Sequence, residues 1–191
     1  MGHDTGGFVA QELALRHPER VAGLVLVATS PGEPGVDEPI AEAWGPPPPV
    51  EVEVLTRVPP ASDAEWEATM KAIAPLCFHR AGAGAPEALY SQTTFSAEAA
   101  VQMMQVVNGW SSADRLADVR APALVVAGRY DALRPPQQSE RLARRMPGAE
   151  LVVLEESGHF PWLEEPEAFF TAVGGWCRRI GGSRMRAAPE R

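Results

Sequence analysis

The sequence has few cysteines and no long apolar run. Its 191 residues include only two cysteines, Cys77 and Cys177, which lie far apart and do not suggest a disulfide framework. No stretch reaches the apolar length of a membrane span, and no basic segment followed by an apolar one opens the chain. We therefore expect a reduced, cytoplasmic protein that has no membrane partner.

Positive charge is also scarce, because 17 lysines and arginines stand against 25 aspartates and glutamates, for a formal net charge of -8. This balance repels phosphate backbones, so no nucleic-acid partner is expected. The arginine cluster near the end of the chain is interpreted as a solvated tail. Pairs of His, Cys or carboxylate residues at ligand spacing are lacking, and the sequence therefore predicts no metal and no cofactor.

The sequence does contain an alternation of helical and strand patterns. Hydrophobic residues make up 45% of the chain, which is ordinary for a globular protein. Short, continuous apolar runs predict strands buried on both faces at 23–29, 123–128 and 150–156. Helical spacing predicts helices at 6–17, 137–145 and 166–179. The sequence thus predicts an α/β fold built on a parallel sheet.

A proline-rich segment interrupts this alternation after residue 30 and includes a run of four prolines at 46–49. It continues through helix-like stretches around Trp66 and Met103. We interpret residues 31–118 as a mainly helical cap inserted into a core made of 1–30 and 119–182, with 183–191 as the tail.

The first helix is preceded by a glycine-rich turn, Gly-His-Asp-Thr-Gly-Gly at 2–7. Such a turn is typical of a strained strand-to-helix connection that points one side chain outward, here that of Asp4. The Thr5 amide would then lie at a helix N-terminus, where it can stabilise an oxyanion. The alternative is an ordinary helix start in which Asp4 is only the N-cap.

Two later residues support the catalytic interpretation. Asp131 follows one predicted strand and His159 follows the next, so both belong at the carboxyl edge of the sheet, where reactive groups of open α/β folds gather. Their order after Asp4, nucleophile then acid then histidine, is one in which catalytic triads occur. Asp4, Asp131 and His159 are therefore the candidate catalytic residues.

Residues 2–32, 121–136 and 157–169 together resemble the α/β-hydrolase superfamily, and the insertion corresponds to its variable cap. Taken as a whole, the sequence is similar to those of proline iminopeptidases and esterases. The Gly-His-Asp turn instead resembles epoxide hydrolases and haloalkane dehalogenases, because most superfamily members have serine at the position of Asp4. The resemblance implies covalent hydrolysis of a small-molecule substrate.

An aspartate changes the chemistry that this arrangement favours. A carboxyl group with an ordinary pKa of about 3.9 is already an anion at neutral pH and needs no base to activate it. Its attack on an ester carbonyl would give a reactive anhydride, whereas attack on a saturated carbon gives a stable ester. Asp4 therefore favours an epoxide or an alkyl halide, and His159, oriented by Asp131, would activate the water that cleaves the ester.

The supporting groups match the resemblance less well. Dehalogenases commonly have tryptophan after the aspartate, and here that position is Thr5. Tyr90 is the candidate proton donor for an epoxide, and Trp110 is a candidate for lining the substrate pocket. His3 is expected to pack at the sheet edge. The acidic pairs at 155–156 and 164–165 are interpreted as solvated faces.

The chain begins next to the turn, so we expect the strand before Asp4, and all earlier strands, to be absent. Only the C-terminal part of a hydrolase sheet would then be present, with the strand at 23–29 at an unpaired edge. This leaves three functional alternatives open: an epoxide or halide hydrolase, an esterase or iminopeptidase relative with aspartate in place of serine, and a truncated chain without activity.

Overall fold

The structure is a computed structural model that describes residues 1–32, 59–80 and 85–187. Its centre is a sheet of four parallel strands in the order β1-β2-β3-β4. The strands span Gly2–His3 (β1), Leu24–Val27 (β2), Ala123–Gly128 (β3) and Glu150–Leu154 (β4). The predicted α/β class and parallel sheet are confirmed.

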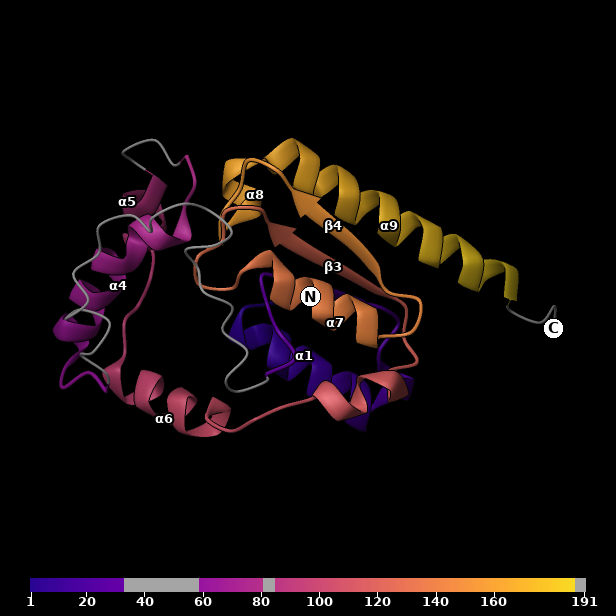
Figure 1. Cartoon of the computed structure of the whole chain (residues 1–191), viewed down its shortest axis with the longest axis horizontal. Coiled ribbons are helices and arrows are strands. Elements are labelled where there is room, and N and C mark those ends of the chain that lie inside the picture. Colours follow the sequence, from indigo (N-terminus) through magenta and orange to yellow (C-terminus); the bar gives the residue numbers. More distant parts are fainter. Residues whose placement is uncertain (33–58, 81–84, 188–191) are drawn as a thin grey trace.

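Helices cover both faces of the sheet (Figure 1). Helices α1 (Thr5–Arg16) and α7 (Pro136–Arg145) pack on one face, and α9 (Pro166–Ala187) packs on the other. Alternate residues of β2 enter the two cores: Leu26 belongs to the cluster with α1 and α7, and Val27 to the cluster with Phe169 and Trp176 of α9. Burial on both faces explains why the strands appear as continuous apolar runs rather than alternating ones.

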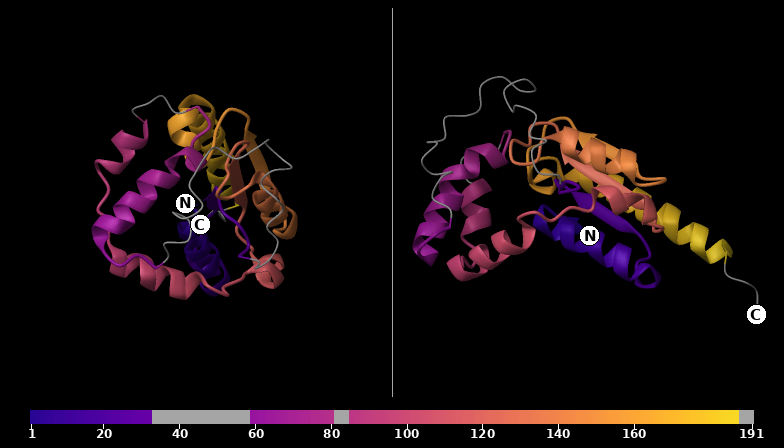
Figure 2. Two further views of the ribbon diagram at one scale, coloured as in Figure 1. Left: turned by 60° about the vertical axis from the view of Figure 1, so that its left-hand side comes forward. Right: turned by 60° about the horizontal axis from the view of Figure 1, so that its bottom comes forward.

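The described part of the predicted cap is helical, as Figure 2 shows. It contains α4 (Asp63–Cys77), α5 (Ala85–Tyr90) and α6 (Ala97–Val107), which lie off the carboxyl ends of the strands. The run of four prolines at 46–49 lies outside the described residues. The short helix η2 (Ala113–Asp118) falls within the predicted insertion, yet its Leu116 is fully buried in the core beside α1 and α7.

The two edges of the sheet are β1 and β4. The expectations that no strand precedes Asp4 and that β2 forms an unpaired edge are wrong, because Gly2 and His3 form β1 and pair in parallel with Leu26 and Val27. A short helix, η1 (Pro18–Arg20), connects α1 to β2, and α8 (Pro161–Glu164) precedes α9. Because all four strands are parallel, their carboxyl ends lie at the same edge of the sheet, and the candidate site lies at that edge.

Both cysteines are free, with Cys77 buried and Cys177 exposed. Within the described ranges, no helix combines the length and the apolar character that a bilayer span requires. The cytoplasmic location stays a prediction.

Candidate active site

Asp4 occupies a strained turn between β1 and α1. Its backbone has φ 46° and ψ -119°, a left-handed conformation that non-glycine residues rarely adopt. Hydrogen bonds hold the turn on both sides: the Asp4 amide donates to Val27 O (3.1 Å) and the Gly7 amide donates to Asp4 O (2.9 Å). Such strain persists only where the surroundings impose it, and it occurs preferentially at functional sites.

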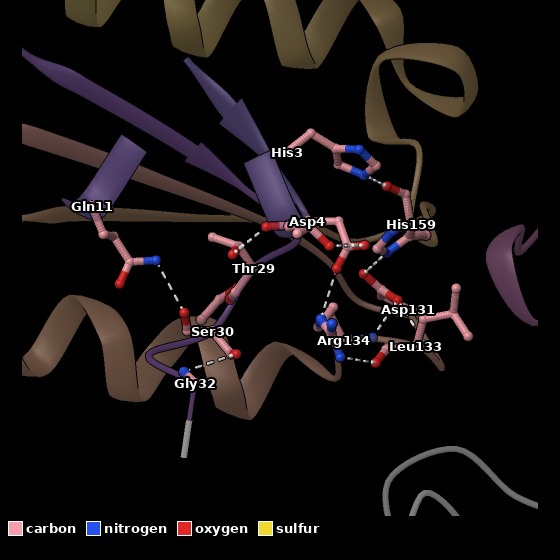
Figure 3. Close-up of polar contacts among 12 residues, drawn as sticks. His3, Asp4, Gln11, Thr29, Ser30, Gly32, Asp131, Leu133, Arg134 and His159 are labelled. Carbon is pink, nitrogen blue, oxygen red and sulfur yellow. Dashed lines mark hydrogen bonds and ion pairs between the residues drawn. The ribbon is translucent and has the colours of Figure 1, made fainter. Parts of the chain in front are cut away.

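Close packing explains two of the glycines around this turn. A Cβ on Gly2 would come within 2.3 Å of the Gly6 carbonyl oxygen, and one on Gly7 within 2.4 Å of Thr29 Oγ1. Thr29 also donates a hydrogen bond from that hydroxyl to Asp4 O at 2.7 Å, and its own carbonyl accepts one from Ser139 Oγ at 3.1 Å. The segment after β2 therefore contacts the turn through Thr29 (Figure 3), and α7 in turn contacts that segment through Ser139.

The Asp4 side chain does not act as a helix cap, since it accepts no capping hydrogen bond. Its Oδ1 accepts a hydrogen bond from Arg134 Nε at 2.8 Å, and its Oδ2 accepts one from Thr5 Oγ1 at 3.2 Å. Burial raises the pKa of Asp4, but the Arg134 guanidinium, with smaller contributions from His159, His3 and the Thr5 amide, lowers it more. The pKa of Asp4 therefore lies below its ordinary value, and the group is a carboxylate at neutral pH.

Asp131 and His159 form a buried hydrogen-bonded pair beside Asp4 (Figure 3). His159 Nδ1 and Asp131 Oδ2 are 2.8 Å apart, and the side chains are 4% and 0% exposed. The other oxygen, Oδ1, accepts hydrogen bonds from the Leu133 amide (3.0 Å) and the Arg134 amide (2.8 Å). The carboxylate is thus fixed on one side by backbone amides and on the other by the imidazole, which leaves His159 Nε2 as the atom that can take a proton.

The loop that carries His159 is held by carboxylates of α8 and its C-cap. Glu164 accepts hydrogen bonds from three backbone amides, those of Gly158 (2.6 Å), His79 (2.8 Å) and Arg80 (2.7 Å). Glu165 accepts hydrogen bonds from the Glu156 amide (2.9 Å) and the Ser157 hydroxyl. The interpretation of residues 164–165 as a solvated face is therefore wrong, because loop amides that need acceptors surround them.

The predicted cap also contacts the histidine loop through its backbone. The His159 amide donates to Cys77 O at 2.7 Å, at the end of α4. A Cβ on Gly158 would come within 2.5 Å of the same oxygen, so this approach requires glycine. The position of the candidate catalytic histidine thus depends on both the core and α4.

His3 packs against the ring of His159 rather than only at the sheet edge. The two ring centroids are 4.5 Å apart, and His3 Nε2 is 2.9 Å from the His159 carbonyl oxygen. A carbonyl can only accept, so His3 Nε2 carries the proton. Burial and the neighbouring His159 lower the pKa of His3 to about 4. His3 is therefore a neutral donor that holds the backbone of His159.

The structure does not bring Tyr90 and Trp110 to Asp4 in the way it brings Asp131 and His159. Trp110 stacks on Phe8 of α1, with ring centroids 4.4 Å apart, and its indole nitrogen donates to Glu12 Oε1 at 3.0 Å. Tyr90 is buried beside Cys77 in the described part of the predicted cap, and burial raises the pKa of its phenol. A phenol with a raised pKa is a weaker proton donor, which does not favour the role expected for Tyr90.

Arg134 is the site residue that sequence reasoning missed. It follows Asp131 by three residues in the same loop, and this closeness in sequence to a candidate catalytic residue could have indicated it. Its side chain is 31% exposed and its guanidinium carbon lies 5.8 Å from the centroid of the Phe8 ring. Among the described residues, no three His, Cys, Asp or Glu side chains gather in a way that could hold a metal ion.

A comparison with known families matches residues 1–172 to the alpha/beta hydrolase family. The chain belongs to the alpha/beta hydrolase family. This confirms the resemblance inferred from the turn and the two strand-end loops. A curated relative, the pimeloyl-[acyl-carrier protein] methyl ester esterase of Aromatoleum aromaticum, is 32% identical over 174 residues, which are 87% of this chain and 68% of the relative.

Two solved structures agree with the fold. An esterase from Thermogutta terrifontis is 27% identical, with a TM-score of 0.68 over 94% of this chain and 64% of that one. An esterase from Exiguobacterium antarcticum, at 22% identity, supports the fold alone, with a TM-score of 0.72 over 93% of this chain and 65% of that one. This alpha/beta hydrolase chain spans about two thirds of the length of these relatives, and they are esterases by name.

Proposed function

We propose that the chain supplies the nucleophile, acid and histidine of a covalent hydrolase in which Asp4 attacks a saturated carbon. The observation that carries this proposal is the Asp4 carboxylate itself. It is ionised, it stands on a strained turn at the start of α1, and it lies beside the buried His159–Asp131 pair. This geometry is what a two-step alkyl transfer needs.

In the first step an Asp4 carboxylate oxygen bonds to the substrate carbon, and the bond to the leaving group breaks with its electron pair. The leaving group is a halide, or the oxygen of an opened epoxide, which then takes a proton. In the second step His159 Nε2 removes a proton from water, and the resulting hydroxide attacks Cγ of Asp4. The bond between Cγ and the alkylated oxygen then breaks, and the alcohol takes the proton from His159. Asp4 is left as a carboxylic acid, and it releases its proton to solvent to regenerate the carboxylate.

The two substrate classes make different demands on the site. A halide leaves without a proton, whereas an epoxide oxygen needs a donor, and the raised pKa of Tyr90 does not favour that residue for this role. The described residues can therefore complete the route from an alkyl halide without a further acid. The comparisons, which name esterases, give no support to either epoxide or halide specificity.

The proposal is tested by trapping the ester. His159→Gln removes the base of the second step and keeps Asp4, so incubation with 1-bromobutane or styrene oxide should leave a covalent adduct on Asp4 that intact-protein mass spectrometry detects. An Asp4→Asn variant, exposed to the same reagents, is the matched control and should remain unmodified. A His159→Gln protein that gains no mass with a panel of such reagents would contradict the proposal.

A second candidate function, ester hydrolysis, is favoured by the relatives, which are esterases by name. It predicts that Asp4→Ser gains activity on short-chain aryl esters, because serine would then stand at the turn beside His159. A folded Asp4→Ser variant with no gain on these esters would count against this candidate. A chain without activity would fail both tests.

A further inference from the structure

Arg134 contacts both the candidate acid, Asp131, and the candidate nucleophile, Asp4. Its backbone amide binds Asp131 Oδ1 at 2.8 Å, and its side-chain Nε binds Asp4 Oδ1 at 2.8 Å (Figure 3). The same loop therefore holds the acid that orients His159 and the cation that faces the nucleophile. This contact follows neither from the glycine-rich turn nor from the order of the three candidate catalytic residues.

The two oxygens of Asp4 have unequal partners. Oδ1 accepts a charge-assisted hydrogen bond from a guanidinium, whereas Oδ2 accepts a longer one, 3.2 Å, from the neutral hydroxyl of Thr5. A hydrogen bond from a cation is roughly twice as strong as a neutral one and withdraws more charge from the acceptor. Oδ2 is therefore the better nucleophile of the two, and Oδ1 would become the carbonyl oxygen of the ester.

On this basis we propose that Arg134 is a catalytic residue of the second step and stabilises the oxyanion that forms on Asp4 Oδ1. The inference rests on the proposed function. When hydroxide attacks Cγ, the carbonyl electron pair moves onto Oδ1, and that atom already faces a fixed cation. When the tetrahedral intermediate collapses, the pair returns and the bond from Cγ to Oδ2 breaks. The Thr5 amide at the start of α1 is the expected second donor, and it also favours the charged form of Asp4.

The same contact has the opposite effect on the first step. Arg134 stabilises the Asp4 anion in the ground state, and alkylation removes that charge, so the cation does not assist the attack. Removing Arg134 should therefore leave alkylation unchanged or faster while it slows ester hydrolysis. This asymmetry distinguishes an oxyanion donor from a residue that only keeps the loop folded, whose loss would slow both steps.

The test measures the two steps separately with 1-bromobutane and styrene oxide under single-turnover conditions. Arg134→Gln should accumulate the Asp4 adduct, with ester hydrolysis slowed by roughly 100- to 1,000-fold, the usual loss for one oxyanion donor. Arg134→Lys, which keeps the charge but not the position of Nε, should fall between the parent and Arg134→Gln. The matched control is Arg129→Gln, which should behave as the parent. Arg129 lies in the same loop as Arg134, but it is exposed and pairs with Glu155 after β4.

The variants also separate the failure of this inference from that of the proposed function. If His159→Gln accumulates the adduct but Arg134→Gln and Arg134→Lys hydrolyse it at the parental rate, the oxyanion role is wrong and the proposed function stands. Equal losses in both steps would also overturn the role, because they indicate a structural defect. If no variant is alkylated, both proposals fail. A second readout is the pH profile of alkylation, whose acid limb should move to higher pH in Arg134→Gln, since Arg134 lowers the pKa of Asp4.

Discussion

The turn that carries Asp4 and the loop that carries His159 are fixed by different means. The turn holds a strained backbone through close packing, with glycines where any Cβ would collide with Gly6 or Thr29. The histidine loop is fixed by hydrogen bonds from its amides and from Ser157 to carboxylates and carbonyls, including those of Glu164 and Cys77. Hydrogen bonds to Asp4 and close packing at Gly158 add to these contacts. Close packing nevertheless contributes more to the turn of the candidate nucleophile, and hydrogen bonds to carboxylates contribute more to the loop of the candidate base, so the two regions should respond to different substitutions.

The largest effect is expected from Asp131→Asn, which should change the protonation of His159 and leave the turn of Asp4 unchanged. The amide oxygen can go on accepting from Leu133 and Arg134, which turns the amide nitrogen toward His159 Nδ1 and forces the imidazole proton onto Nε2. Ester hydrolysis should fall by about 10,000-fold, as for the same change in a catalytic triad. Alkylation of Asp4, followed by intact-protein mass, should continue. A loss of both alkylation and ester hydrolysis would contradict the claim that the Asp4 turn and the His159 loop are fixed independently.

The second effect concerns acid stability. The pKa of His3 falls from 6.5 to about 4 in the folded protein, so protonation favours the unfolded chain. The contribution of neutral His3 is complete above about pH 6.5 and is lost as the pH falls toward 4, by at most about 3 kcal/mol. His3→Gln should flatten the dependence of melting temperature on pH in this range. His17→Gln, at the exposed end of α1, is the control, and an equal flattening there would contradict the assignment to His3.

The third prediction compares two neighbouring glycines of the turn. Gly7→Ala places a methyl group within 2.4 Å of Thr29 Oγ1, whereas a methyl group on Gly6 meets nothing within 4 Å outside its own helix. Gly7→Ala should lower the free energy of unfolding by about 1–3 kcal/mol, as overpacking does. Gly6→Ala should be neutral or should stabilise α1 by up to about 1 kcal/mol. Urea denaturation measures both, and equal effects would show that close packing does not fix the turn.

The smallest effect is expected from Glu164→Ala, which leaves the amides of Gly158, His79 and Arg80 without their acceptor. Of these amides only that of Gly158 belongs to a buried residue, and the loss of its acceptor should cost about 1–2 kcal/mol of unfolding free energy. Ester hydrolysis should also slow, because the loop of His159 loosens. Glu155→Ala removes an exposed partner of Arg129 and should change little. If the two variants behave alike, the hydrogen bonds that Glu164 accepts are not what positions the histidine loop.

Much of the fold was predictable because a strand that is buried on both faces of a sheet appears in the sequence as a continuous run of apolar residues. The runs of apolar residues predicted β2, β3 and β4 to within two residues at each end. Helical spacing predicted α1 and α7 to within one residue at each end. Asp131 and His159 were located by their position after strands. Their contact needs only that parallel strands end at one edge of a sheet.

The remaining site features depend on loop conformation, which leaves no periodic pattern. The contact of Arg134 with Asp4 joins residues 130 positions apart and depends on the turn of the loop after Asp131. Glu164 was misassigned because an acidic pair on a short helix has the same composition whether water or backbone amides surround it. Trp110 is a large aromatic residue in the predicted insertion, and only tertiary packing places it on Phe8 of α1.

The measurement that tests the central claim most directly is the fate of oxygen-18 from labelled water in a single turnover with enzyme in excess. If Asp4 is the nucleophile, water attacks its carbonyl carbon, and cleavage after Arg16 should release a peptide of residues 1–16 that contains one heavy oxygen, at Asp4. The alcohol formed in that turnover should be unlabelled, because its oxygen comes from the carboxylate. A labelled alcohol with an unlabelled peptide would mean that water attacks the substrate directly, and it would contradict the account.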